Sequence, residues 1–279
     1  MLDLTIAIPV KNEEVNIGGC IDAIGTGLAQ KIVVIDSGST DKTIEIATYK
    51  GAEVINFEWN GEFPKKRNWY LRNHTPSTKW ILFLDADEYL TADFKQELRK
   101  ALADNQKNKN IAGYWLHYSI YFLGKPLKGG YPLVKLALFK VGAGEYEKIE
   151  ELRWSNMDME IHEHPILSGK TSEIKSKIDH RDYRGIDSYL RKHNEYAAWE
   201  ASRYEVVKSN KLLYDQFTWK QKLKYKLMGS ALIGPVFFLG SYFLMGGFRD
   251  GSRGFVFAIL KMSYFTQIYC RVKENKKSW

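Results

Sequence analysis

Short apolar runs of strand length alternate with helix-like segments in the first part of the chain. The runs are rich in β-branched and aromatic residues, as buried strands are, and cover residues 4–8, 31–35, 52–55 and 80–84. Apolar residues recur at helical spacing in residues 13–24, 41–49, 66–73 and 93–105. Strands that alternate with helices predict an α/β fold with a mainly parallel sheet flanked by helices.

Hydroxyl side chains stand before two of the predicted helices. Ser39 and Thr40 precede the second helix, and Thr91 precedes the fourth. A hydroxyl oxygen in this position accepts a hydrogen bond from a backbone N–H of the first helical turn. We therefore expect all three residues to act as N-caps.

The last third of the chain has a different pattern. Residues 183–210 carry apolar and aromatic residues through charged sequence and predict one long helix. The basic segment 220–226 is followed by 22 residues, 227–248, without a charge. A run of this length can cross a bilayer, but its glycines and Pro235 interrupt a helix and both of its flanks are basic. We expect interfacial helices on an anionic leaflet, with a true span or a buried dimer interface as alternatives.

Charge is distributed unevenly along the chain. Residues 1–110 carry 14 Lys+Arg and 16 Asp+Glu, whereas the remainder carries 27 and 17, so the positive excess belongs to the C-terminal part. Such an excess suits nucleic acid or an anionic membrane surface. A nucleic-acid-binding protein needs neither a long uncharged stretch nor paired strand-end aspartates, so we expect no nucleic-acid partner.

Cysteine usage and the first residues indicate the compartment. Only Cys20 and Cys270 are present, so no disulfide framework supports the fold, and a reducing compartment is the simpler expectation. Residues 1–10 have no basic n-region and lead into the polar segment 11–14, which predicts a first strand rather than a signal peptide. We therefore expect the protein at the cytoplasmic face of a membrane.

Acidic residues follow the fourth predicted strand, where an open α/β sheet binds its ligands. Asp85 and Asp87 come directly after five apolar residues, and their spacing sends both side chains to one face if the strand geometry persists. Two close carboxylates raise each other's pKa unless a cation is shared. A hard divalent ion with oxygen ligands is the natural partner, and helix capping alone explains the pair poorly.

Three segments resemble the successive signatures of family-2 glycosyltransferases. They are Ile-Pro-Val-Lys-Asn-Glu-Glu at 8–14, Val-Ile-Asp-Ser-Gly-Ser-Thr-Asp-Lys-Thr at 34–43 and Leu-Asp-Ala-Asp-Glu at 84–88. Each segment alone is a weak signal, but their order and their βα intervals make the combination specific. The resemblance implies a GT-A-type (Rossmann-like) fold and a nucleotide-sugar donor, a UDP-sugar.

The resemblance also implies roles for residues at the first two strand ends. Pro9, Val10 and Glu13 would line the nucleotide pocket. Asp36 would accept a hydrogen bond from the base.

At the third signature, the resemblance implies a metal site. Asp85 and Ala86 would lie near the ribose and the metal, and Asp87 would ligate Mg²⁺ or Mn²⁺ that bridges the donor diphosphate. Arg67, in the basic-Asn pair before this strand, would meet the donor phosphates. The alternative for Arg67 is a solvated helix face, which is the common place for basic residues.

A longer pattern is similar to the lipopolysaccharide-core glucosyltransferase-like subgroup. It comprises Trp-Asn-Gly-Glu-Phe at 59–63, Gly-Gly-Tyr-Pro at 129–132, Leu-Phe-Lys at 138–140 and Ile-His-Glu at 161–163. The subgroup tends to have Gln-Lys-Asn where this chain has Lys-Arg-Asn at 66–68, so the donor sugar cannot be carried over. The resemblance implies a lipid-linked or lipopolysaccharide glycan as acceptor.

The segment 158–165 is the densest group of titratable side chains in the second half, and its alternation suggests a strand that enters the site. By resemblance to the His-Glu signature, Glu163 is the general base, with Glu160 as the substitute. His162 is either a metal ligand or an orienting residue. The alternative for any one of them is a polar edge strand exposed to water.

Two further features are weaker. His180 could be a late metal ligand that reaches back toward Asp87, although lone histidines are more often structural. The aromatic residues of 114–122 could stack on a sugar ring, but their strict strand character favours core packing.

These observations predict three regions: a nucleotide-sugar-binding α/β half at 1–110, the acceptor-side half of the same domain at 111–182, and a helical, membrane-associating region at 183–279. The expected activity is metal-dependent, inverting sugar transfer. One alternative is transfer to a polyprenyl phosphate, which is already ionised and needs no base. The other is a catalytically silent membrane scaffold, against which the clustered carboxylates argue. The sequence does not indicate the oligomeric state.

Overall fold

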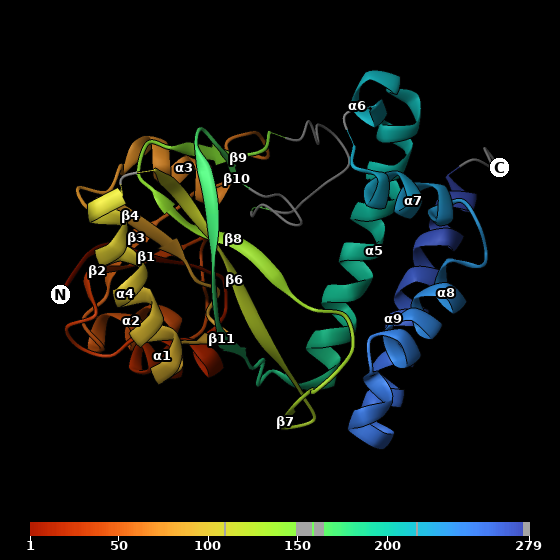
Figure 1. Cartoon of the computed structure of the whole chain (residues 1–279), viewed down its shortest axis with the longest axis horizontal. Coiled ribbons are helices and arrows are strands. Elements are labelled where there is room, and N and C mark those ends of the chain that lie inside the picture. Colours follow the sequence, from red (N-terminus) through yellow and green to blue (C-terminus); the bar gives the residue numbers. More distant parts are fainter. Residues whose placement is uncertain (109, 149–157, 159–164, 216, 276–279) are drawn as a thin grey trace. The chain divides into compact units, whose positions relative to one another are not determined.

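The computed structural model describes residues 1–108, 110–148, 158, 165–215 and 217–275 (Figure 1). Two compact units divide the chain between them. The first comprises Met1–Tyr121 and Pro132–Tyr183, and the second comprises Phe122–Tyr131 and Arg184–Trp279.

The first unit contains the four expected strands and the four expected helices, followed by further strands. Its helices are α1 (Glu14–Ile24), α2 (Thr43–Tyr49), α3 (Lys66–Asn73) and α4 (Ala92–Asn108). Its strands are β1 (Leu2–Val10), β2 (Ala29–Asp36), β3 (Glu53–Asn56), β4 (Trp80–Phe83), β5 (Glu88–Tyr89), β6 (Ile111–Phe122, whose last residue falls in the second unit), β8 (Val134–Lys140), β9 (Gly144–Tyr146), β10 (Pro165–Leu167) and β11 (Lys170–His180).

The main sheet has the strand order β3-β2-β1-β4-β8-β6-β11-β5. The pairings among β3, β2, β1 and β4 are parallel, as the sequence predicts for this half. From β8 onward the sheet is mixed, because β8 is antiparallel to both β4 and β6 while β11 is parallel to β6. Strands β9 and β10 form a separate two-stranded antiparallel sheet.

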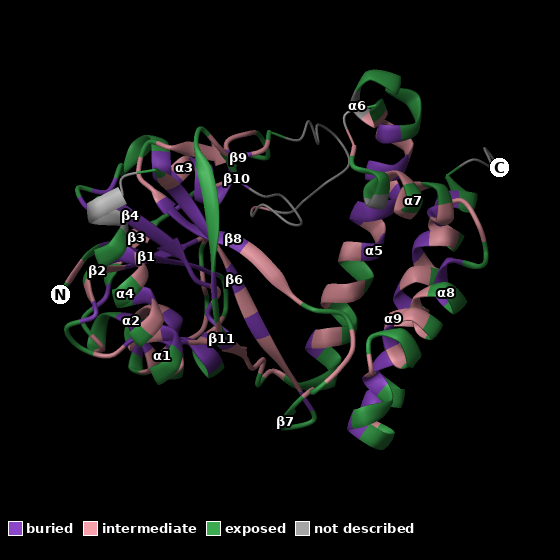
Figure 2. Cartoon of the chain, in the orientation of Figure 1, coloured by how far each residue is buried: buried purple, intermediate pink, exposed green. Residues whose placement is uncertain are grey.

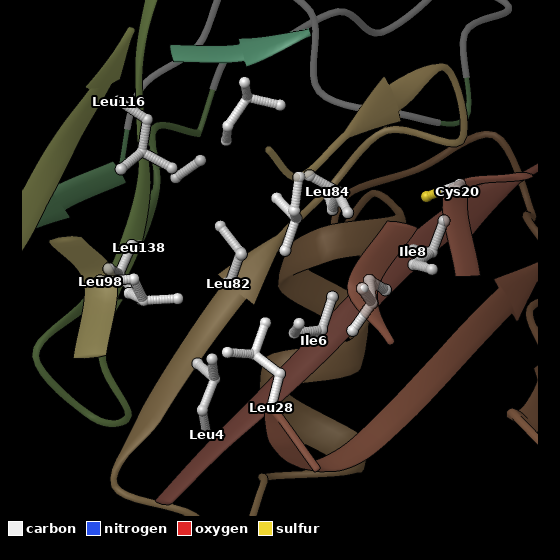
Figure 3. Close-up of a cluster of buried hydrophobic side chains, with 14 of the residues drawn as sticks. Leu4, Ile6, Ile8, Cys20, Leu28, Leu82, Leu84, Leu98, Leu116 and Leu138 are labelled. Atoms are coloured by element: carbon white, nitrogen blue, oxygen red, sulfur yellow. The ribbon is translucent and has the colours of Figure 1, made fainter. Parts of the chain in front are cut away.

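Strands β1, β2 and β4 of the parallel half carry buried residues on both faces, whereas the edge strand β3 has none that is fully buried. Leu4, Ile6 and Ile8 of β1 point into the larger core cluster, where α1 and α4 also contribute apolar residues (Figure 3). Ala7, between them, joins the smaller cluster on the other face, together with Tyr70 of α3. The alternation along β1 therefore fixes which side chains each face buries.

The helix starts agree with the sequence prediction only in part. Thr91 is the predicted N-cap of α4, since its Oγ1 accepts a hydrogen bond from the Phe94 N–H at 3.2 Å. The prediction is wrong for Ser39 and Thr40, because α2 begins only at Thr43. The Ser39 hydroxyl instead donates to Asp36 in the turn after β2.

The second unit is helical, and the long helix predicted for residues 183–210 is present as α5. Its elements are β7 (Lys125–Pro126), α5 (Gly185–Ser209), α6 (Lys211–Asp215), α7 (Trp219–Met228), α8 (Ile233–Leu239), the π-helical turn η1 (Gly240–Leu244), the 3₁₀ turn η2 (Gly247–Asp250) and α9 (Gly251–Glu274). The uncharged run 227–248 is thus divided among four short pieces. Within the described residues, no helix has the length and apolar character needed to cross a membrane.

The core of the second unit joins four of its helices. It combines Ala197, Ala201 and Tyr204 of α5, Met228 of α7, Ile233 of α8, and Tyr264, Ile268 and Val272 of α9. A charged pair lies beside this core, where Glu200, only 2% exposed, contacts Lys224 Nζ at 2.7 Å. A buried carboxylate needs such a partner, so Lys224 serves the packing of α7 on α5.

Residues 122–131 leave the sheet between β6 and β8 and belong to the helical unit. The Asp250 carboxylate accepts hydrogen bonds from the backbone N–H groups of Lys128 and Gly129 at 2.9 Å. Gly130 N–H donates to the Met245 carbonyl oxygen at 2.9 Å. This connection is therefore held by the turns between α8 and α9.

We expect Gly129→Ala to destabilise the second unit. A Cβ at Gly129 would lie 2.1 Å from the Gly246 carbonyl oxygen and 2.8 Å from the Gly247 nitrogen, so backbone would have to move. Such overpacking costs about 1–3 kcal/mol. Thermal unfolding followed by circular dichroism checks this, with Gly240→Ala as the control, since a Cβ at Gly240 meets nothing within 4 Å. Equal melting temperatures for the two variants would contradict the prediction.

Candidate active site

The carboxyl ends of β1, β2 and β4 lie side by side. Val10 at the end of β1 pairs with Asp36 at the end of β2. The Leu84 N–H, just after β4, donates to the Ala7 carbonyl oxygen at 3.0 Å. The loops that follow these strands carry the three sequence signatures, so the fold brings all three to one edge of the sheet.

The loops after β1 and β2 are joined by several hydrogen bonds. Asn12 N–H donates to Ser39 Oγ at 2.8 Å, and its Oδ1 accepts from Thr40 N–H at 2.8 Å. Glu13 N–H donates to Thr43 Oγ1 at 2.7 Å. Ser39, one of the two predicted caps of α2, therefore uses its hydroxyl to join the two loops instead.

The residues predicted to meet the nucleotide occupy this joined region. Pro9 and Val10 are buried at the end of β1, and Glu13 is half-buried and accepts a hydrogen bond from Asn16 Nδ2 at 2.9 Å. Asp36 is only 1% exposed, and one of its oxygens accepts from Gly38 N–H at 2.9 Å. The Asp36 carboxylate therefore orders its own turn, and its contact with a base stays a prediction.

The start of α3 is buried rather than solvated. Lys66 is 2% exposed, and its Nζ donates to the Val10 carbonyl oxygen at 2.9 Å and to Ser37 Oγ at 2.7 Å. Burial lowers the pKa of Lys66, while the carboxylate of Asp158, at 3.2 Å from Nζ, opposes the shift. Arg67 is 8% exposed, so the alternative of a solvated helix face is wrong for both residues.

Asp85 stands between two cationic side chains. Arg67 Nη2 lies 2.8 Å from its Oδ1, and Lys135 Nζ lies 2.6 Å from its Oδ2. Burial raises the pKa of the Asp85 carboxyl, but Lys135 and Arg67 outweigh that effect and hold the pKa far below its usual range. Asp85 is therefore an anion that links α3 to β8.

Lys135 contacts a second acid, Glu88, whose Oε1 lies 2.6 Å from Nζ. Glu88 is 1% exposed, and its Oε2 accepts a hydrogen bond from the Asp85 N–H at 3.1 Å. Burial, with the nearby charges of Asp85 and Asp87, raises the pKa of Glu88, although Lys135 opposes the shift. Sequence reasoning missed both residues. The one available signal was a lysine inside the apolar strand-like stretch at 133–139.

Asp87 lies next to His180, the weaker metal-ligand candidate. The distance from Asp87 Oδ1 to His180 Nε2 is 3.6 Å. The pairing of β5 with β11 sets this distance, because His180 pairs with Glu88 and Arg181 N–H donates to the Asp87 carbonyl oxygen at 2.7 Å. Asp87 is 6% exposed, so its carboxylate is held in place.

These side chains fit a divalent ion in part. Carboxylate oxygen and imidazole nitrogen are suitable ligands for Mn²⁺, and Mg²⁺ is often held by one or two carboxylates together with substrate phosphates and water. Among the described residues, no group of three or more His, Cys, Asp or Glu side chains is arranged to hold a metal. Asp87 and His180 would supply two ligands if an ion bound here, and both oxygens of Asp85 are already in contact with cations.

Part of the predicted acceptor side lies outside the described residues. This holds for Glu160, His162 and Glu163, so their predicted roles stay predictions. Asp158, at the start of that segment, is described, and its backbone oxygen accepts a hydrogen bond from the Lys66 N–H at 3.0 Å. Ala86, between the two aspartates, is 3% exposed and packs in the larger core cluster.

A parallel half-sheet with acidic loops at its carboxyl edge has the architecture of a nucleotide-binding α/β enzyme. Residues 5–136 match the family model for glycosyl transferase family 2. The matched range contains all three signatures, which agrees with the resemblance that they predicted.

Two relatives illustrate the range of similarity. The chain is 26% identical over 275 residues to the lipopolysaccharide core biosynthesis glycosyltransferase LpsC of Rhizobium meliloti, covering 94% of this chain and 89% of that protein. It is 29% identical over 124 residues to an uncharacterized glycosyltransferase of Rickettsia typhi, covering 44% of this chain and 41% of that one. The chain thus spans less than half the length of some of the curated relatives that it matches.

Solved structures of glucosyl-3-phosphoglycerate synthase from Mycobacterium tuberculosis are also similar to part of the chain. One of them, in complex with Mn²⁺, UDP and glucosyl-3-phosphoglycerate, is 24% identical with a TM-score of 0.33, covering 42% of this chain and 44% of that chain. A likeness at this level says nothing about the ligands of this chain.

We expect Lys135→Met to lower the free energy of unfolding by about 3 kcal/mol, since removal of one partner leaves buried charges uncompensated. Urea unfolding measures the loss. Lys31→Met is the matched control, because Lys31 pairs with Glu53 at 2.6 Å but both side chains are nearly half exposed. An exposed pair contributes less than about 1 kcal/mol. Equal losses in the two variants would mean that the Lys135 cluster has no special role in stability.

Proposed function

We propose that the protein transfers a sugar, with inversion, from a UDP-sugar to a hydroxyl group of a lipid-linked or lipopolysaccharide glycan. The observation that carries this proposal is the meeting of Asp85, Asp87, Arg67 and His180 at the carboxyl edge of a family-2 glycosyltransferase domain. The match to a lipopolysaccharide core glycosyltransferase over most of both chains supports the choice of acceptor.

Charge balance around Asp85 supports a divalent ion. Lys135 and Arg67 already contact Asp85, and Lys135 also contacts Glu88, so their charges are largely offset by carboxylates. A donor diphosphate brings further negative charge to this edge. Asp87 and His180 would hold Mg²⁺ or Mn²⁺, which supplies the positive charge that steadies the departing diphosphate.

The protein's own groups have separate duties in this proposal. The joined loops after β1 and β2 bind the nucleoside, with Asp36 toward the base. Glu163 takes the proton of the acceptor hydroxyl, with Glu160 as the substitute. Inverting transfer needs this base and no separate nucleophile.

A donor screen tests the proposal directly. Nucleotide sugars are offered with Mn²⁺ or Mg²⁺, and both thermal protection and slow donor hydrolysis are recorded. A ligand that binds the folded state raises the melting temperature by linkage, so the protecting donor identifies the pocket. Absence of protection by every nucleotide sugar, with and without metal, would favour the silent scaffold.

Asp87→Asn should abolish transfer and leave the fold intact, because an amide keeps the shape of the side chain and loses the charge that holds the cation. The melting temperature without metal should match that of the unmodified protein, while the shift caused by Mn²⁺ and donor should disappear. Asp104→Asn, at an exposed position of α4, is the control and should change neither. Full turnover of Asp87→Asn with the usual metal dependence would remove Asp87 from the metal site.

Glu163→Gln should reduce turnover by roughly a hundredfold, the usual loss for a general base, while donor binding survives. Single-turnover transfer and donor titration separate the two effects, and Glu160→Gln is the paired variant. If donor affinity falls as well, Glu163 belongs to the donor or metal side and Glu160 becomes the base candidate. Undiminished turnover of both variants would point to an acceptor that is already ionised, such as a polyprenyl phosphate.

A further inference from the structure

One end of the helical unit exposes an unusual number of large apolar side chains. This apolar end comprises the large exposed hydrophobic residues between Leu232 and Ile259, in α8, η1, η2, the first turns of α9 and the residues that flank them. Figure 2 shows exposed positions recurring along α8 and α9. Its members are Leu232, Val236, Leu239, Phe243, Leu244, Met245, Phe248, Phe255, Val256 and Ile259. Leu244 is the most open of them, at 87% exposed. A cluster of this kind marks a surface that binds a partner.

Ring contacts show that the apolar end is one surface rather than scattered positions. Phe255 of α9 lies 5.9 Å from Phe238 of α8 and 5.6 Å from Tyr242 of η1, measured between ring centroids. Phe243 lies 5.0 Å from Tyr242. The exposed residues of α8 and η1 therefore adjoin those at the start of α9.

The exposed face of α9 changes character along its length. Phe255, Val256 and Ile259 are exposed in its first turns, whereas the next exposed positions of the same face are Ser263 and Thr266. These positions follow the three-to-four-residue spacing of one helix face. The change confines the apolar surface to one end of the helical unit, as partial insertion into a bilayer requires.

Positive charge accompanies the apolar side chains. The charged residues between Leu232 and Ile259 are Arg249, Arg253 and one acid, Asp250. Asp250 is 8% exposed, and its carboxylate accepts the backbone hydrogen bonds of Lys128 and Gly129. Arg249, which follows the exposed Phe248, is itself exposed. The surface thus combines apolar side chains with the exposed positive charge of Arg249.

The structure corrects part of the membrane contact expected from sequence. Lys224 is engaged by buried Glu200, so it does not contribute a free charge. Ile233 is fully buried in the helical core, and the Phe237 ring stacks on Phe265 with centroids 3.6 Å apart. On α8 the exposed apolar side chains are therefore Val236 and Leu239, while Ile233 belongs to the helical core.

We infer that the apolar end inserts into the headgroup region of an anionic bilayer leaflet. An anionic surface complements Arg249 and Arg253, each worth about a severalfold gain in binding, whereas a second copy of the chain would bring these like charges together. The acceptor named here, a lipid-linked glycan, rests on the proposed function, but the docking itself does not. Docking would hold the enzyme at the surface where such an acceptor presents its sugar.

Vesicle sedimentation of the full-length protein tests the inference. Two kinds of vesicle are used: phosphatidylcholine alone, and phosphatidylcholine mixed with an equal amount of phosphatidylglycerol. We expect binding to the mixed vesicles, reduced at least about tenfold by Leu244→Glu, because an apolar contact is lost and a negative charge is added. Arg249→Glu should weaken binding to the mixed vesicles severalfold. High salt should release the protein only in part, since the apolar contribution is not screened.

Tyr49→Glu is the control, because Tyr49 is 89% exposed but lies at the end of α2 in the first unit. It should bind vesicles like the unmodified protein, and all variants should keep the unmodified melting temperature.

Failure of the unmodified protein to bind mixed vesicles, or equal binding by Leu244→Glu, would overturn the inference. So would a dimer in sedimentation velocity that Leu244→Glu dissociates, because the apolar end would then join two copies. Donor hydrolysis without vesicles is measured in parallel. This assay reports the proposed activity and vesicle sedimentation reports the docking, so failure of one is distinguished from failure of the other.

Discussion

The ion pairs of Asp85 are the interactions on which the first unit's functional edge depends. Its carboxylate follows β4 directly, and it contacts Arg67 from α3 and Lys135 from β8. Buried charges are stable only when they are paired. These ion pairs therefore fix the positions of α3, β8 and the turn after β4 relative to one another. Because Asp87 is two residues further on, the same pairs determine where its carboxylate meets His180. The positions of Asp87 and His180 at the proposed metal site thus depend on the ion pairs of the nearby Asp85.

Local patterns in the sequence predicted the parts of this edge that are formed by neighbouring residues. The strands β1 to β4 and the acidic turn after β4 follow from apolar runs and from residue spacing. Lys135 could not be predicted in the same way, because its contact with Asp85 spans 50 residues and depends on β8 pairing beside β4. The approach of His180 to Asp87 was predicted only as a weaker feature, and it depends on the pairing of β11 with β5. Long-range register, which single-sequence patterns do not contain, determines both contacts.

The capping error has a similar cause. Ser39 and Thr40 have the side chains of N-caps, and local preference alone would place them at the start of α2. Asn12, in the loop after β1, offers its own hydrogen bonds to both, and these compete successfully with a cap. Because the two loops bond to each other, this edge of the sheet is cross-linked, and α2 begins two residues later than predicted.

The connection 122–131 has a consequence for synthesis and folding. It leaves the sheet between β6 and β8, yet the carboxylate that orders it belongs to Asp250, 122 residues after Lys128. A growing chain therefore completes the strands around the active site well before the group that fixes their connecting loop exists. A chain that stops before residue 250 would therefore carry a loop in which the backbone N–H groups of Lys128 and Gly129 lack this acceptor.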